Sequence, residues 1–296
     1  MGDQGRLALI TSATTMALEK TPESTSKDNG LAETREFTLT DNGPSNVVEI
    51  TRPTGIYESG YRAYYADKPD QDTRNGVQGY VQAEYVSDNL TRVDRTDPAD
   101  LSRPFELTIA CEKAKRGFTN LEDAQVAIRV DRMFQMLPDE LKRKDDADEK
   151  KDNGSDKKKK PRTEDWWLDA PYNVEWNYEL TPPAGFIAKD LPKDATIEIG
   201  PALLTENFSA GKNGAVLAHL VFDTEKRRYT VVEATALRNE IADLINGPAI
   251  LVNFEPEGAA LLREGKVKEA LASYRALIAL NPNAAVHHLP GSGRAA

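Results

Sequence analysis

The chain has one cysteine, Cys111, and three histidines, the residue types that supply nucleophile and base in thiol acyl-transfer chemistry. That chemistry requires a thiolate within hydrogen-bond reach of an imidazole. In the segment PFELTIACEKA, apolar side chains alternate with polar or small ones, and the apolar set is Phe105, Leu107, Ile109 and Cys111. This period of two predicts a strand with one buried face. We therefore expect the thiol to be a buried apolar group with a raised pKa and no reactivity.

The histidines offer no clear partner for this thiol. His219 falls within the strand-like segment GAVLAHLVFD, on the opposite parity from the apolar residues of that segment, so a structural side chain is predicted. His287 and His288 are adjacent in a segment rich in Pro and Gly, and residues 283–296 are predicted to form a disordered tail. Neither setting favours a rigid Cys-His pair.

Other sequence motifs for catalysis or ligand binding are also missing. The sequence contains no GxSxG elbow, no GxxxxGK[ST] phosphate loop, no CxxC and no HExxH. We therefore predict no catalytic residue, no metal ligand and no cofactor in this chain, and we expect that it is not itself an enzyme.

Several aromatic side chains are candidates for an interaction surface. Exposed Trp and Tyr side chains can bind protein or carbohydrate partners, whereas aromatics on strands usually belong to the core. The candidates are Trp166, Trp167, Tyr64, Tyr65 and Tyr274, with Tyr61 as a further possibility.

The elements that would position these residues form two β-rich segments. In residues 31–141, strands are expected on both sides of a turn at residues 42–44, and a helix is expected within residues 67–85. The segment IYESGYRAYYA fits either a strand or a short helix. Residues 165–254 contain the alternating strand YNVEWNYEL, with Trp176 facing inward and Glu175 outward, and three more strands follow.

The second segment continues into a helix with a defined start and end. Thr230 and Glu233 have the spacing of a capping box, and Gly247-Pro248 ends the helical pattern. The sequence thus predicts an α+β, mainly β fold. It consists of two β-rich modules, sandwich-like antiparallel sheets with one or two packed helices each, plus a C-terminal helical hairpin.

That hairpin is predicted in residues 255–282. Gly265 separates two helical stretches, and Val267, Leu271, Tyr274 and Ile278 share one helix face. Small residues at the helix contact, the Gly turn and the closing Pro282 resemble one tetratricopeptide repeat, although an ordinary helical hairpin has the same features. A single repeat cannot bury its own apolar face. The array is therefore either truncated, or its first unit docks on the preceding domain.

Composition limits the remaining possibilities. The chain has 296 residues, enough for two domains, and its net charge of −10 disfavours nonspecific binding to nucleic acid. The sequence lacks an apolar stretch of membrane-spanning length and a signal peptide, and a single cysteine excludes an internal disulfide framework. Residues 142–164 contain a highly charged segment with no large apolar residue until Trp166, which predicts a disordered linker.

Several segments together resemble a known family. They include LEKTPES, GPSNVVE, DPADLSRPFELTI, AKRGFTNLEDAQVAIR, PYNVEWNYELTPPAGF, GPALLTENFSA and FDTEKRRYTVVEATALR, and they extend from about Gly5 to Pro282. The chain resembles the C-terminal part of large bacterial transglutaminase-like proteins. In these proteins an N-terminal β-rich domain of unknown function precedes a papain-like core, and a β-rich region follows, sometimes with tetratricopeptide repeats.

The resemblance implies a non-catalytic role. It places residues 1–30 as the last strand and exit loop of a core that lies before Met1, so that strand is expected to be an unpaired edge in this chain. No position here matches the family's Cys-His-Asp triad, and Cys111 does not correspond to its nucleophile. The implied function is a non-catalytic accessory region with two partners: the upstream core, and a protein bound through the repeat. The implied location is periplasmic or extracellular. The alternatives are a stand-alone adaptor or carbohydrate-binding module, and a hydrolase with an unrecognised site.

Overall fold

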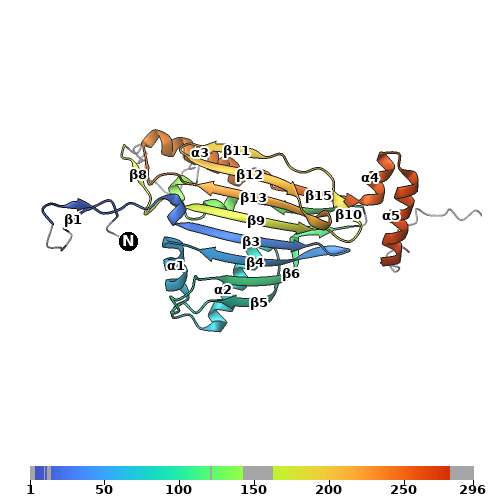
Figure 1. The fold of residues 1–296 in the computed structure, drawn as a ribbon, viewed down its shortest axis with the longest axis horizontal. Helices are drawn as coiled ribbons and strands as arrows, with labels where there is room; N and C mark the ends of the chain where they lie inside the picture. Colours follow the sequence, from blue (N-terminus) through green and yellow to red (C-terminus); the bar gives the residue numbers. More distant parts are fainter. Residues whose placement is uncertain (1–3, 10, 12–14, 121, 143–162, 281–296) are drawn as a thin grey trace, which may run out of the picture.

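The structure, a computed structural model, describes residues 4–9, 11, 15–120, 122–142 and 163–280 (Figure 1). Its centre is one eleven-stranded sheet. Ten strands follow one another across it in the order β10 (Phe186–Ala188), β15 (Ile250–Pro256), β7 (Ala124–Ile128), β6 (Leu107–Thr119), β4 (Gly43–Pro53), β3 (Gly30–Thr38), β9 (Asn173–Thr181), β13 (Val216–Asp223), β12 (Ala202–Ala210) and β11 (Ala195–Ile199). The eleventh, β5 (Asn89–Arg95), also pairs with β6.

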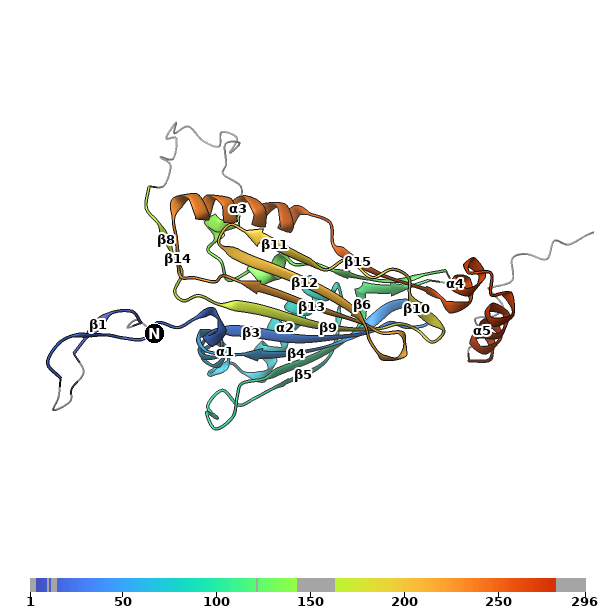
Figure 2. The same cartoon turned by 45° about the horizontal axis from the view of Figure 1, so that its top comes forward.

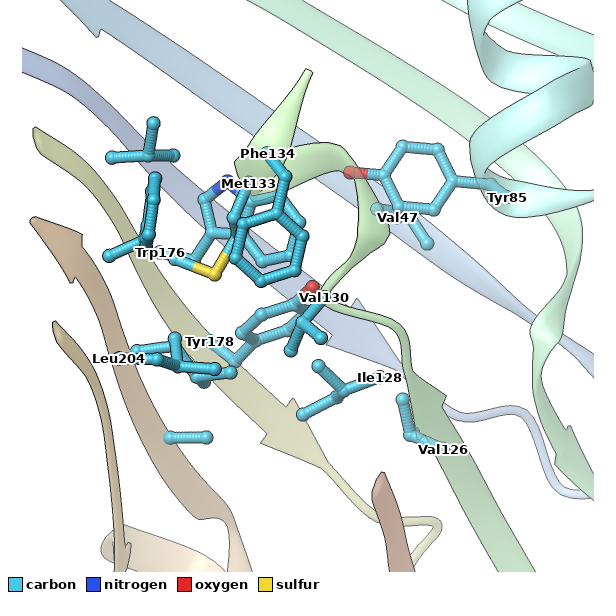
Figure 3. Packing of buried hydrophobic residues seen from close by; sticks show 14 of the residues in the cluster. Val47, Tyr85, Val126, Ile128, Val130, Met133, Phe134, Trp176, Tyr178 and Leu204 are labelled. Atoms are coloured by element: carbon cyan, nitrogen blue, oxygen red, sulfur yellow. The ribbon is translucent and has the colours of Figure 1, made fainter. Parts of the chain in front are cut away.

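The sheet curls because β6 is long and irregularly paired. Its first half pairs with β5 and its last three residues with β7, and its register with β4 shifts twice near Ser45. Lys113 in β6 has a φ of 56°, which is consistent with a bulge at this point. Bulges bend strands, and here β7 and the segment after it face β9 and β12 across the core (Figure 3). The side chains that meet there include Val126, Ile128, Val130, Met133, Phe134, Trp176, Tyr178 and Leu204.

The predicted α+β, mainly β class is confirmed, but the two β-rich segments do not form separate sheets. Strand β3 of the first segment pairs in parallel with β9 of the second, from Gly30 opposite Asn173 to Thr38 opposite Thr181. Strand β15 of the second segment pairs antiparallel with β7 of the first. The buried residues of both segments also belong to one core cluster. The expectation of two independently packed modules is therefore wrong, because strand pairing joins them at two places.

Five α-helices occur in the described residues: α1 (Ile56–Tyr65), α2 (Asp70–Tyr85), α3 (Val231–Asn246), α4 (Glu257–Arg263) and α5 (Val267–Leu280). Short 3-10 helices are η1 (Ser26–Asp28), η2 (Asp131–Phe134), η3 (Asp139–Leu141) and η4 (Lys212–Gly214). The segment that fitted either strand or helix is α1. Helix α3 begins with the predicted capping box, in which Thr230 Oγ1 accepts from the Glu233 amide. Figure 2 shows α3 lying over the β11 and β12 end of the sheet.

Among the residues that the structure describes, two small strand pairs lie outside the large sheet. Strands β8 (Trp166–Trp167) and β14 (Arg228–Tyr229) pair with each other. Strand β1 (Leu7–Ala8) pairs with β2 (Glu19–Lys20) in a ribbon that extends away from the sheet (Figure 1). The expectation that the strand in residues 1–30 is unpaired is therefore wrong, because β1 pairs with β2. The side chains of β1 are still accessible to solvent, and Leu7 is 69% exposed.

Other predictions fall partly or wholly outside the described residues. Nearly all of the predicted linker at residues 142–164, the tail at residues 283–296, His287 and His288 are in this group. Among the residues that are described, no helix combines the length and apolar character needed to cross a membrane.

Candidate functional site

The inner faces of β3, β4 and α2 bring a group of ionisable side chains together around Arg35. Glu33, Arg35 and Phe37 alternate on the inner face of β3, and Arg35 is 1% exposed. Its Nη2 donates to Glu33 Oε2 at 2.6 Å, and its Nη1 donates to Glu84 Oε1 of α2 at 2.8 Å. We call Arg35, Glu33, Glu49 and Glu84 the buried charge cluster.

Glu49 of β4 completes this cluster from the other side. Its Oε2 lies 3.4 Å from Arg35 Nε and accepts a hydrogen bond from the Tyr80 hydroxyl at 2.7 Å. The Tyr85 hydroxyl donates to the same oxygen. Each buried carboxylate in this cluster therefore has a charged or hydroxyl partner, as buried charges require.

Aromatic rings enclose the Arg35 guanidinium. Its Cζ lies 3.8 Å from the centroid of the Trp176 ring on β9. The Tyr178 hydroxyl accepts from Arg35 Nη1 at 2.8 Å. Cation–π contacts strengthen when water is excluded, and that condition holds here. The cluster thus ties β3 to β4, to α2 and to β9, which belongs to the second segment.

The charges of the cluster do not balance. Three carboxylates face Arg35, and Arg132 of η2 adds one further cation through Glu84, with Nε and Oε2 2.6 Å apart. Burial raises the pKa of Glu33 from 4.5 to about 7, and the nearby Glu49 and Glu84 add to this effect, whereas Arg35 opposes it. Because all of these side chains are largely closed to solvent, the cluster is a structural feature of the core.

We expect Glu33→Gln to reduce the loss of stability between pH 5 and pH 8. A folded-state pKa of about 7, above the ordinary 4.5, means that the protonated carboxyl stabilises the fold fully below pH 4.5. This stabilisation is lost as pH rises through 7. Glutamine stays neutral and keeps an oxygen that can accept from Arg35. Urea unfolding of both proteins at the two pH values measures the difference.

The matched control is Glu36→Gln, an exposed position on the same strand. It should leave the pH dependence of the wild type unchanged. Equal pH slopes in the wild type and the Glu33→Gln protein would show that Glu33 is ionised throughout the range.

The predicted interaction aromatics on β8 have different environments. Trp167 is 59% exposed, and the guanidinium carbon of Arg228 lies 5.4 Å from the centroid of its ring. Trp166 is half-buried and packs against the core. Only Trp167 of this pair is available as a surface contact.

The predicted tyrosines of α1 are likewise divided. Tyr64 is exposed, with Lys68 Nζ 3.3 Å from its ring centroid. Tyr65 is buried and stacks on Phe105 with centroids 5.8 Å apart, and the additional candidate Tyr61 packs against the same ring. These residues lie at the opposite end of the sheet from α5 and Tyr274, so the candidates do not form one surface (Figure 1).

Tyr274 has a packing role in the predicted helical hairpin, which is present as α4 and α5. A Cβ atom at Gly258 of α4 would lie 2.6 Å from the Tyr274 ring, so this close helix contact requires glycine. Ala270 of α5 is also fully buried. The hairpin is joined to the sheet by an ion pair between Arg263 and Glu255 of β15.

The outer face of α5 is apolar and exposed. Val267, Leu271 and Ile278 are 63%, 50% and 49% exposed. Their spacing of four and seven residues places them on one side of the helix. We call these three residues the α5 stripe.

Cys111 and His219 do not form a catalytic pair. Cys111 is buried on β6, and burial raises the pKa of its thiol to about 12. A raised pKa was also the prediction from the sequence. His219 is on the outer face of β13, where its Nε2 lies 3.0 Å from Glu175 Oε1. Strands β4, β3 and β9 separate β6 from β13, a distance of about 19 Å at ~4.8 Å per strand.

The buried charge cluster was not identified from the sequence. A signal was available in ETREF and NVVEIT, where charged residues occupy the same parity as apolar residues that face the core. A charge in a buried row indicates a compensating partner, although it does not say which residue supplies it.

Comparisons with known proteins add little. No family model and no curated protein matches this sequence. The crystal structure of a putative protease from Parabacteroides distasonis ATCC 8503 is similar over 32% of this chain and 19% of that chain, with 17% identity and a TM-score of 0.27. Such a short and distant likeness carries no argument about fold or function.

Proposed function

We propose that this chain is a non-catalytic accessory region that binds a helical segment of another protein through its α4–α5 hairpin. The observation that carries this proposal is the α5 stripe, a row of apolar side chains that the sheet leaves uncovered. Single exposed apolar residues are normal, but a row at helical spacing suits a partner.

The partner class follows from the geometry of the stripe. An apolar ridge along a helix packs into the groove of a second helix, as in helical repeats and helix-in-groove complexes. The close Gly258–Tyr274 contact gives the hairpin a fixed shape on which to present that ridge. This arrangement supports the resemblance to a tetratricopeptide repeat, which would stack a further helical unit here.

The ribbon of β1 and β2 provides a second contact region in this proposal. Leu7, Leu9, Met16 and Leu18 are each more than half exposed there, and Met16 reaches 98%. In the transglutaminase-like proteins that the sequence resembles, this position adjoins the papain-like core. The proposed accessory role therefore has that core as one partner and a periplasmic or extracellular location.

A photo-crosslinking residue at position 271 tests the hairpin surface. We expect Leu271→p-benzoylphenylalanine to form covalent adducts with one helical repeat protein or transglutaminase-like protein in the cells that make this chain. Mass spectrometry identifies the adduct and the crosslinked segment. The matched control is Val232→p-benzoylphenylalanine, because Val232 is a 78% exposed apolar residue on α3. Equal adducts from both positions, or none from position 271, would contradict the proposal.

A further inference from the structure

A small cavity of about 250 Å³ lies at the C-terminal end of α3, between that helix and strands β7 and β12. Apolar side chains form much of its lining, chiefly Ile128, Val130, Leu244 and Ile250. Its acidic lining residues are Glu206, Glu240 and Asp243. We call it the α3 cavity.

Glu206 is the unusual residue of the α3 cavity. It is 9% exposed and occupies an inward position of β12 between Leu204 and Phe208. Its neighbours in register are Ala195 on β11 and Leu220 on β13. Among the described residues, no side chain or amide hydrogen bonds or pairs with its carboxylate, and burial raises its pKa. A buried carboxylate without a partner is costly, so its presence beside a cavity points to a ligand that supplies one.

The charges around Glu206 indicate which sign of charge that ligand carries. Glu240 and Asp243 lie in the last two turns of α3, and the last turn has no basic residue. The carbonyl end of a helix carries partial negative charge, so acidic residues there favour a nearby cation. Arg129 is the cationic side chain among the described lining residues, and it already contacts Asp131 at 3.1 Å and the Ile245 carbonyl at 2.7 Å.

The size and the apolar lining restrict the cation further. Sites for drug-sized ligands usually measure about 300–1,000 Å³, so this cavity fits a single side chain or a small amine. An ammonium group on an alkyl stem places its charge at Glu206 and its methylene groups against the apolar lining. Within the described residues, no group of three His, Cys, Asp or Glu side chains could hold a metal ion.

We propose that the α3 cavity binds a primary alkylammonium group, with Glu206 as the carboxylate that pairs with it. The group can be the lysine side chain of a polypeptide or a free aliphatic amine, since the recognised chemistry is the same. This site is separate from the hairpin and does not depend on the proposed function.

Calorimetric titration of the purified full chain tests this site. The probes are n-pentylamine, Nα-acetyl-lysine methylamide and, as a neutral match, n-pentanol. We expect both amines to bind saturably and n-pentanol not to bind. Glu206→Gln should weaken amine binding about tenfold or more, because it removes a charge-assisted hydrogen bond. The control Glu179→Gln, exposed on β9, should leave affinity unchanged.

Each outcome either tests the proposed site or identifies the source of the alkylammonium group. Binding of n-pentylamine without the lysine derivative supports a free amine, and binding of both supports a polypeptide lysine. Equal affinity for n-pentanol, equal affinity of the Glu206→Gln protein, or no binding of either amine overturns the site. Circular dichroism checks that the variant folds. If it does not, Glu240→Gln on the helix surface should weaken binding about two- to threefold, and no change in that variant also overturns the proposal.

Discussion

Arg35→Met is expected to lower the free energy of unfolding by about 3–5 kcal/mol or to prevent folding. Methionine has a similar length and an apolar character, so the change removes the charge while keeping much of the packing. Glu33 and Glu49 would then remain buried without their cation, whereas Glu84 would keep Arg132. Urea unfolding followed by circular dichroism measures the loss.

The matched control is Arg52→Met on the neighbouring strand β4. Arg52 forms an ion pair with Glu106 at 2.8 Å, and both side chains are about half exposed. Such surface pairs contribute about 0–1 kcal/mol, so the control should change stability little. If the two variants lost similar stability, the idea that Arg35 neutralises buried carboxylates would have to be abandoned.

Trp176→Ala is expected to destabilise the protein by about 3–5 kcal/mol. The indole is 1% exposed and lies beneath the Arg35 guanidinium, with the Tyr178 ring 6.3 Å away. Its Nε1 has no partner among the described residues, so the loss is one of packing and cation–π contact and not of a hydrogen bond. Chemical unfolding of the variant measures this loss directly.

Two controls show whether the loss of stability depends on the buried position of Trp176 or only on the removal of a large side chain from β9 or of an indole. Trp167→Ala removes an exposed indole, and Glu175→Ala changes the outward neighbour of Trp176 on β9. Both should cost well under half of the Trp176→Ala effect, since surface changes usually stay within about 0.5 kcal/mol. Equal losses at positions 175 and 176 would contradict the assignment of Trp176 to the buried face of β9 and of Glu175 to its outer face. Because Trp176 touches Arg35, their effects should not be additive in a double mutant.

Local features of this fold could be predicted from the sequence. The parity of Trp176 and Cys111 followed from alternation along single strands, and the start of α3 followed from Thr230 and Glu233. Each of these features depends on residues close together in the chain. The same holds for the helical hairpin, which Gly265 divides.

Long-range features could not be predicted in this way. The pairing of β3 with β9 joins residues that are remote in sequence, and alternation says which face is buried but not which strand lies alongside. The charge cluster draws its members from β3, β4 and α2, and the Trp176 and Tyr178 side chains that contact Arg35 reach it only through that pairing. Glu206 was missed for a related reason, since ALLTENF indicates a strand and gives no sign of the cavity beside it.

The β3–β9 pairing also has a consequence for how the chain is made. On the ribosome, β3 can pair with β4 early, but its other edge has no partner until Thr181 has been added. At usual rates of synthesis, the interval between Thr38 and Thr181 lasts on the order of ten seconds. During that time the nascent first half presents an open strand edge, which can aggregate or recruit a chaperone. If the polypeptide were divided within residues 143–162, β3 in the first piece would still require β9 in the second piece as its partner. The two pieces would therefore protect each other's strand edges only when they are made together.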